Sequence, residues 1–170
     1  NGSGRLGDNS TTLRRLTPVA VTGLSGVQKI AVGEQHSCAL ISGGSVKCWG
    51  ANNQAQLGNG FDFIKAPTTV SGISNASEIG VGVNHSCARL DNGSVKCWGD
   101  VQAVGIDTNN NQLTPVTVEN ITTASQISSS YKRSCSRLSD GTIKCWGIND
   151  DGQLGDGTTT NRSSPVTVSG

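Results

Sequence analysis

The sequence predicts an all-β fold of the β-propeller type, with three four-stranded blades, part of a fourth, and one disulfide-closed hairpin in each blade. The first observation is that all three tryptophans lie in a repeated Lys-Cys-Trp-Gly motif, at Trp49, Trp98 and Trp146, spaced by 49 and 48 residues. The second is that the four prolines follow nearly the same period: they are Pro18, Pro67, Pro115 and Pro165. A unit of this length with four short strands is typical of a propeller blade. A generic β-sandwich, the alternative, would not place identical residues at a fixed period.

The composition supports a fold without helices. The 170 residues include 23 glycines and no methionine, and only 15% are charged, which favours turns and short strands. No segment carries apolar residues at the i, i+3, i+4 and i+7 positions of an amphipathic helix. We therefore expect one repeat domain over residues 1–170, with units 1–50, 51–99 and 100–147 and a partial unit 148–170.

Four strand-like pieces can be located within one period. Residues 18–21 predict an edge strand, because proline cannot donate to a ladder on both sides. Residues 28–33 alternate, with Ile30 and Val32 on one face, as a half-buried strand does. Residues 36–41 and 45–49 then predict a tight hairpin around a Ser-Gly-Gly turn.

Each repeat contains one pair of cysteines separated by nine residues. A three-residue turn that ends in a left-handed glycine places the two cysteines of a pair directly opposite each other on the hairpin, whereas a two-residue turn would place them on opposite faces. The predicted disulfides are Cys38 with Cys48, Cys87 with Cys97, and Cys135 with Cys145. Zinc is the alternative, but the position of His36 and His85 is occupied by Arg133 in the last repeat, and a metal site would not lose a ligand. Three disulfides predict an oxidising location: extracellular, cell-surface or periplasmic.

Charge and hydropathy exclude two classes of partner. The formal net charge is +1, and the longest basic clusters are the pairs at residues 14–15 and 132–133, so we expect no nucleic-acid partner. No apolar stretch approaches the roughly 20 residues needed to span a bilayer, so we expect no membrane insertion. The chain begins at Asn1 without a methionine or a leader, which suggests a mature or excised segment.

The repeat resembles a known family. The segments are Gly33 to Leu40 (GEQHSCAL), Asn92 to Gly99 (NGSVKCWG) and Trp146 to Gly157 (WGINDDGQLGDG). They are similar to the regulator of chromosome condensation repeat, in a cysteine-bearing form that is frequent in bacterial surface and secreted proteins. The resemblance covers essentially the whole chain and implies a β-propeller. It does not imply one activity, because the family includes exchange factors, protein inhibitors, photoreceptors and binding proteins.

The resemblance also implies that His36 and His85 are structural hydrogen-bonding residues rather than catalytic ones. The third repeat departs from the family pattern in three places: Val104-Gly105-Ile106 stands where Gln-Leu-Gly is expected, Ser128-Ser129-Ser130 replaces Gly-Val-Gly, and Arg133 replaces the histidine. Such a blade is either looser than the others or carries a contact.

No residue constellation occurs only once, as a catalytic site would. We therefore predict a non-enzyme without catalytic, cofactor-binding or metal-binding residues. The turn Asn149-Asp150-Asp151-Gly152 lacks the glutamate that ends a calcium loop. Phe61 and Phe63, the only phenylalanines, form either a contact loop or a local mini-core. Asn-x-Ser/Thr sequons, which a turn-rich sequence also produces by chance, occur at Asn1, Asn9, Asn75, Asn84, Asn92, Asn120 and Asn161.

A closed propeller needs about 4 to 8 blades, more than this chain supplies. Further blades of the same protein, a second copy, or copies stacked into a filament would cover the terminal faces. The first hypothesis is a structural or assembly subunit that self-associates through blade faces and strand edges. The alternative is a propeller that binds a protein or glycan, and an enzyme is the weakest hypothesis.

Overall fold

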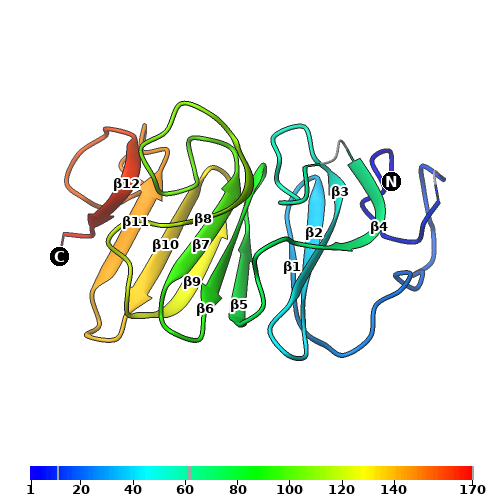
Figure 1. Cartoon of the computed structure of the whole chain (residues 1–170). Helices are drawn as coiled ribbons and strands as arrows, with labels where there is room; N and C mark the ends of the chain where they lie inside the picture. The colour runs from blue at the N-terminus through cyan, green and yellow to red at the C-terminus, as the bar shows by residue number, and fades with distance from the viewer. Residues whose placement is uncertain (11, 61–62, 170) are drawn as a thin grey trace.

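The computed structural model describes residues 1–10, 12–60 and 64–169. Of Phe63 it describes the backbone but not the side chain. These residues form three four-stranded antiparallel sheets and no helix, so the all-β prediction is confirmed (Figure 1). The first sheet, blade 1, contains β1 (Val27–Val32), β2 (His36–Ile41), β3 (Val46–Ala51) and β4 (Phe63–Thr69). Blade 2 contains β5 (Ala76–Val81), β6 (His85–Leu90), β7 (Val95–Gly99) and β8 (Gln112–Thr117). Blade 3 contains β9 (Ala124–Ser130), β10 (Arg133–Leu138), β11 (Ile143–Gly147) and β12 (Arg162–Thr167).

The central hairpin of each blade has the predicted register. Cys38 lies opposite Cys48, Cys87 opposite Cys97, and Cys135 opposite Cys145. Each pair forms a disulfide with Cα atoms 4.1 Å apart. The turns end in Gly44, Gly93 and Gly141, whose φ angles of 81°, 80° and 90° are those of the left-handed region. The three-residue turn and the cysteine pairing are both confirmed.

The outer strand of each blade is the last of its four strands in the chain and comes after the tryptophan of that blade, whereas the sequence pattern placed it before the other three. β12 pairs with β11, so residues 148–167 complete blade 3. Pro67, Pro115 and Pro165 lie inside β4, β8 and β12, beside an irregularity in the pairing. An outer strand tolerates proline there because one of its edges has no neighbour.

The prediction of a strand at residues 18–21 is wrong. Residues 12–26 are all described and contain no strand. The sequence pattern matches that of β12, but no described strand lies beside it to complete a ladder. A strand needs a partner for its backbone groups, and a local sequence pattern does not reveal whether one is present.

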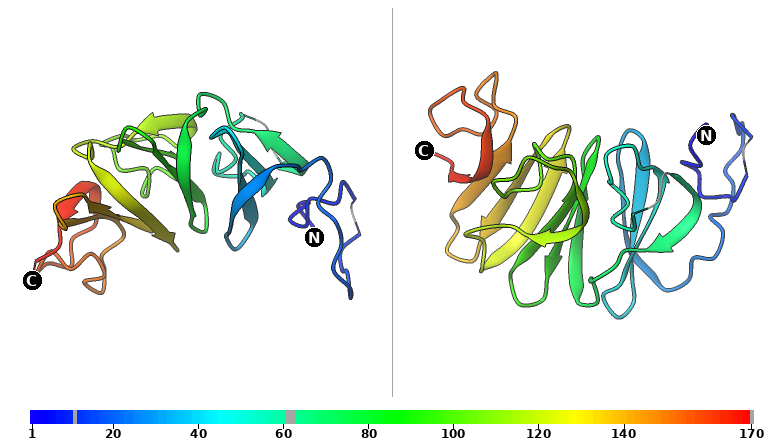
Figure 2. Two further views of the ribbon diagram at one scale, coloured as in Figure 1. Left: turned by 90° about the horizontal axis from the view of Figure 1, so that it is seen from below. Right: turned by 45° about the horizontal axis from the view of Figure 1, so that its top comes forward.

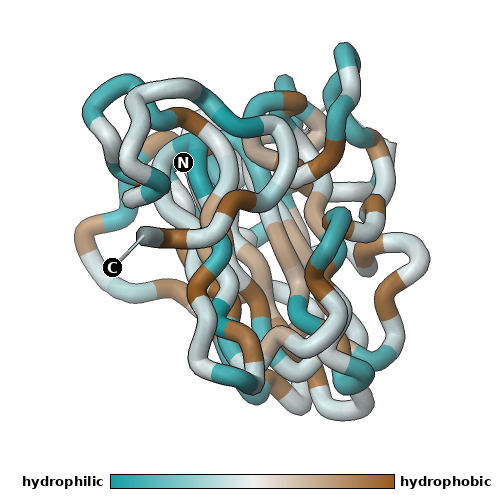
Figure 3. The backbone as a smooth tube through the Cα atoms, turned by 90° about the vertical axis from the view of Figure 1, so that its left-hand side faces the viewer, coloured by the Kyte–Doolittle hydropathy of each residue, from teal (hydrophilic) through white to brown (hydrophobic). Residues whose placement is uncertain are grey.

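The three sheets fan out along an arc, with the two termini at opposite ends (Figure 2). The first strands of adjacent sheets contact each other, β1 with β5 and β5 with β9. Seen from the blade 3 end, hydrophobic and hydrophilic residues alternate along the chain, as expected for strands with two different faces (Figure 3).

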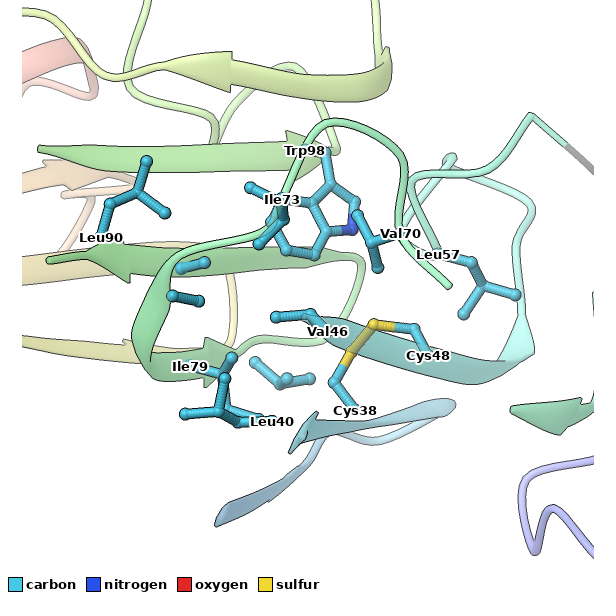
Figure 4. Close-up of a cluster of buried hydrophobic side chains, with 13 residues drawn as sticks. Cys38, Leu40, Val46, Cys48, Leu57, Val70, Ile73, Ile79, Leu90 and Trp98 are labelled. Carbon is cyan, nitrogen blue, oxygen red and sulfur yellow. A yellow bond between two sulfur atoms is a disulfide. The ribbon is translucent and has the colours of Figure 1, made fainter. Parts of the chain in front are cut away.

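The hydrophobic core lies between the blades. One cluster joins the Cys38–Cys48 disulfide, Leu40 and Val46 of blade 1 to Ile79 and Trp98 of blade 2 (Figure 4). A second cluster joins the blade 2 disulfide and Val95 to Ile127 and Trp146 of blade 3. The disulfides of blades 1 and 2 are therefore packed against the following blade, and the positions of the site residues depend on these two junctions.

Candidate functional site

The two histidines are part of the junctions between blades. His36 Nε2 lies 2.8 Å from Ser86 Oγ of blade 2, and His85 Nε2 lies 2.8 Å from Ser134 Oγ of blade 3. Ser86 donates its hydroxyl to the Gln56 carbonyl at 2.9 Å, so its oxygen accepts the proton of His36 Nε2. These distances agree with the structural role that the family resemblance implied. The serine partners, 49 or 50 residues away, were not identified from the sequence.

Neither ring offers an accessible base. Both histidines are completely buried, and their Nδ1 atoms have no hydrogen-bond partner among the described residues. Burial is the main cause that lowers the pKa of His36 to about 3, and the charge of His85 lowers it further. Burial also lowers the pKa of His85 to about 4, against a smaller opposing effect of Asp100. Both imidazoles are therefore neutral and sealed from solvent at neutral pH.

The tryptophans of blades 2 and 3 are bonded to the loop before the outer strand of the preceding blade, and that of blade 1 to the N-terminal segment. The indole Nε1 donates to the carbonyl of Arg5 for Trp49 (3.1 Å), of Gln56 for Trp98 (2.9 Å) and of Ala103 for Trp146 (3.0 Å). The lysine of the same motif also reaches back: its Nζ donates to Gly23 for Lys47, to Gly72 for Lys96 and to Asn120 for Lys144. The regular spacing of the Lys-Cys-Trp-Gly motif indicates a common role for these side chains, but it does not show which backbone carbonyls they contact.

Two departures of the third repeat, at the positions of Gly82 and His85, belong to one contact. A Cβ atom on Gly82 would collide with the ring of His85 and would lie 2.6 Å from the Tyr131 carbonyl. The glycine therefore makes room for the histidine. In blade 3 both change together, since Ser130 stands at the glycine position and Arg133 at the histidine position. Arg133 is half-buried. Because His85 at the equivalent position contacts the following blade, the repeat position of Arg133 corresponds to the side of blade 3 that faces away from blade 2.

The face of blade 1 that points away from blade 2 is an exposed apolar surface, which we call the entry face. Ile30 and Val32 are 70% and 69% exposed there. Their repeat equivalents Ile79 and Val81 of blade 2 are 9% and 8% exposed, because blade 1 covers them. A cleft of about 610 Å³ lies between the entry face and the N-terminal segment, and it is lined by Leu6, Leu16, Pro18, Val19, Val21, Ile30, Val32 and Trp49 among others.

The opposite face of blade 3, which we call the exit face, shows the complementary pattern. Ile143 is 44% exposed, whereas its equivalents Val46 and Val95 are fully buried against the next blade. The Cys135–Cys145 disulfide lies on the same side, where the other two disulfides pack on a following blade. The entry face of blade 1 and the exit face of blade 3 thus correspond to the two surfaces that meet at each junction between blades.

A second groove, of about 370 Å³, lies between the long loops of blades 2 and 3. It is lined by Val101, Gln102, Thr108, Asn109, Gly147, Ile148, Asn161, Arg162 and Ser163. Beside it Lys132 Nζ donates to Gln102 Oε1 at 3.1 Å and forms an ion pair with Asp100 at 3.5 Å. Most of these side chains do not recur in the other repeats. Amide and hydroxyl side chains in its lining can donate and accept hydrogen bonds.

The remaining predicted site residues are scattered. Among the sequon asparagines, Asn9, Asn75, Asn92, Asn120 and Asn161 are exposed, while Asn1 and Asn84 are half-buried. Phe61 lies outside the described residues, as does the side chain of Phe63, so the predicted contact loop stays a prediction. Asn149 is buried and donates to Asp156 Oδ1 and to backbone carbonyls, which makes its turn a structural one.

The described residues offer neither a metal cluster nor a membrane-spanning helix. No cluster of three His, Cys, Asp or Glu side chains could hold a metal ion there, and all described cysteines are in disulfides. The same part of the chain contains no helix of sufficient length and hydrophobicity to cross a membrane.

Sequence comparison identifies one family. Two family models, both described as the Regulator of chromosome condensation (RCC1) repeat, match the chain. The first covers residues 27–56, 76–100 and 124–153, and the second covers residues 1–40 and 140–170. No significant match was found among curated protein sequences.

Solved structures show the same fold. Yeast RCC1 (Prp20) bound to Kap60 matches with a TM-score of 0.87 and 20% identity over 100% of this chain and 43% of that chain. Prp20p from Saccharomyces cerevisiae matches with a TM-score of 0.81 and 21% identity over 100% of this chain and 45% of that one. Human WBSCR16 matches with a TM-score of 0.83 and 18% identity over 99% of this chain and 46% of that one. The chain thus spans less than half the length of each of these three proteins.

Proposed function

The chain belongs to the Regulator of chromosome condensation (RCC1) repeat family, and we propose that it acts as a non-catalytic, protein-binding propeller module. The titles of the solved relatives describe yeast Prp20 bound to Kap60 and its binding properties to Gsp1p and histones. Protein binding by this fold supports the same general role here. The buried, neutral histidines and the lack of a once-only reactive cluster among the described residues support a role without catalysis.

The proposed location is outside the cytoplasm: extracellular, on a cell surface, or periplasmic. Three disulfides support it, because such bonds persist in oxidising compartments. The five exposed sequon asparagines would be acceptors for glycans if the compartment glycosylates proteins. Intact-mass measurement of the native protein tests both proposals, since it detects attached sugars and the loss of six protons from three disulfides.

The proposed mechanism is burial of blade faces against further blades, from other copies or from the same protein. The observation that carries it is the contrast between exposed Ile30 and Val32 and buried Ile79 and Val81. The same two side chains are covered in blade 2, which blade 1 precedes, and the equivalent Ile127 is covered in blade 3. Self-association through these faces would make the chain an assembly subunit, and it would produce filaments if the contact does not close into a ring.

Light scattering of the non-reduced chain across a concentration series tests this mechanism. We expect the mass to rise above that of one chain, and we expect Val32→Lys to lower it because a charge would be buried in the contact. Val32 is exposed in the single chain, so the variant should fold. Leu113→Lys is the control, since Leu113 is similarly exposed but lies on outer strand β8. A chain that stays monomeric at all concentrations would contradict self-association.

The groove between blades 2 and 3 favours a second candidate function, recognition of a protein or a glycan. It offers amide and hydroxyl groups from Gln102, Thr108, Asn109 and Ser163, which suit an extended polar ligand. Screening against panels of immobilised glycans and peptides, with Gln102→Ala and Asn109→Ala as groove variants, tests it. Binding that both variants leave unchanged would exclude the groove.

A further inference from the structure

The N-terminal segment repeats the outer part of blade 3, both in sequence and in local structure. Arg15 to Val21 (RLTPVAV) matches Arg162 to Val168 (RSSPVTV). The Asp8–Arg15 ion pair is 2.7 Å long, as is the equivalent Asp156–Arg162 pair. The preceding asparagines also have the same role, because Asn1 Nδ2 donates to Asp8 Oδ1 and Asn149 Nδ2 donates to Asp156 Oδ1.

The two segments differ in what lies beside them. Residues 162–167 pair with β11 as strand β12, whereas residues 15–21 pair with no described strand. The 610 Å³ cleft lies between residues 15–21 and the entry face of blade 1. At the junctions of blades 1 with 2 and 2 with 3, the corresponding space is filled by the three inner strands of the preceding blade. The cleft therefore lies where a blade would lie, between an outer-strand segment and the entry face. The three inner strands of such a blade are not supplied by the described residues.

We propose that the occupant of this cleft is blade 3 of a second copy, and that residues 15–21 replace β12 on its β11. This inference rests on the proposed self-association and specifies its geometry. The register of β12 places Thr167, Val166 and Arg162 opposite Lys144, Cys145 and Gly147. In the exchanged sheet, Ala20, Val19 and Arg15 take those three positions, and the second copy's residues 148–170 are displaced.

The apolar contacts of the junctions support this arrangement. In the junction of blades 2 and 3, Val95 and Ile127 belong to one buried cluster. Ile143 is the equivalent of Val95 and is exposed on the exit face, while Ile30 is the equivalent of Ile127 and is exposed on the entry face. Docking one copy's exit face on another's entry face buries both. Exchange replaces one outer strand by a similar one, so the net gain comes from this newly buried surface.

Charge complementarity favours a second copy over an unrelated blade. The ring of His85 lies beside the turn of the next blade that contains Tyr131, as the shared contact at Gly82 shows. Arg133 holds the histidine position on the exit face, and Glu34 holds the position of Tyr131 at the turn of the entry face. Docking brings the cation against the carboxylate. Arg133 replaces the histidine of the other two repeats, and Glu34 stands where those repeats have the uncharged residues Val83 and Tyr131. Glu34 is exposed and Arg133 half-buried in the single chain.

A charge swap tests this geometry. We measure the association constant of the non-reduced chain by light scattering for Glu34→Arg, Arg133→Glu and the double variant. Each single variant should weaken association by about tenfold through like-charge contact, and the double variant should restore it. Glu34 and Arg133 lie on blades at opposite ends of the fan, so restoration requires two copies. Asp91→Arg, in an exposed turn, is the control.

Hydrogen exchange followed by mass spectrometry on the same samples reports the strand exchange. Protection should rise at residues 15–21 and fall at residues 162–168 as the chain associates. Association with no effect of the swap and unchanged protection would overturn the exchanged geometry while leaving blade-face self-association standing. A wild-type chain that is monomeric throughout would overturn both.

Discussion

The contrast between equivalent isoleucines gives a quantitative test of where the core lies. Ile79 is 9% exposed and Ile127 4%, both packed against the preceding blade, whereas Ile30 is 70% exposed. Truncation of a buried isoleucine to alanine costs about 2–5 kcal/mol, because the lost transfer free energy adds to that of a cavity. We therefore expect Ile79→Ala and Ile127→Ala to lower the free energy of unfolding by about 3 kcal/mol each.

Ile30→Ala is the matched control, with the same chemical change at the same repeat position. Its side chain is mostly in water, so the free energy of unfolding should change by less than about 0.5 kcal/mol. The assay is urea unfolding of the non-reduced chain, followed by tryptophan fluorescence at a concentration where the protein is monomeric. Equal losses for Ile30→Ala and Ile79→Ala in the monomer would refute the view that only a neighbouring blade buries this position.

Three further predictions concern the junctions and the hairpins. Burial lowers the pKa of His85 from 6.5 to about 4, so as the pH falls the unfolded chain takes up a proton before the folded chain does. The contribution of His85 to the free energy of unfolding is fully present above pH 6.5 and has fallen by about 2 kcal/mol at pH 5. Urea unfolding at pH 7 and pH 5 should therefore show a smaller loss for His85→Gln than for the wild type, and equal losses would contradict the assignment. Replacing Cys87 and Cys97 by alanine should cost about 2–3 kcal/mol in the free energy of unfolding, since the hairpin loop is no longer closed; an unchanged urea midpoint would show that the bond is not formed in solution. Gly82→Ala should lower the free energy of unfolding by about 2 kcal/mol or more, because its Cβ meets the His85 ring. Ser130→Ala, an exposed change at the same repeat position, should leave the midpoint of thermal unfolding nearly constant. Similar midpoints for the two variants would argue against this contact.

The hairpins could be predicted from the sequence because their information is local. The distance between Cys87 and Cys97 and the turn glycine Gly93 together determine the register, and both lie within a few residues of each other. The period of the repeat then located the hairpin of each of the three blades. The family resemblance implied a hydrogen-bonding role for His36 and His85, and both make the same kind of contact, to a serine of the next blade.

The junctions could not be predicted in the same way. Trp98 donates to Gln56, 42 residues earlier, and nothing in a local pattern specifies which carbonyl a distant indole meets. The wrong strand at residues 18–21 has the same origin, because the pattern of a strand was present and its partner was not. The exposed entry face also required the structure, since Ile30 and Ile79 occupy the same place in the repeat and differ only in their neighbours.

The disulfides have a consequence for how this chain would respond to mechanical tension. Each bond joins two adjacent strands of one blade, whereas the described contacts at the junctions between blades are non-covalent: hydrogen bonds, an ion pair and apolar packing. A force applied to the two ends would pull the blades apart before it could unravel a central hairpin, because the covalent bond removes the hairpin loop from the length that can be extended. Under load the chain would lengthen in steps, one junction at a time, and would keep three intact hairpins from which the sheets can re-form when the force is removed.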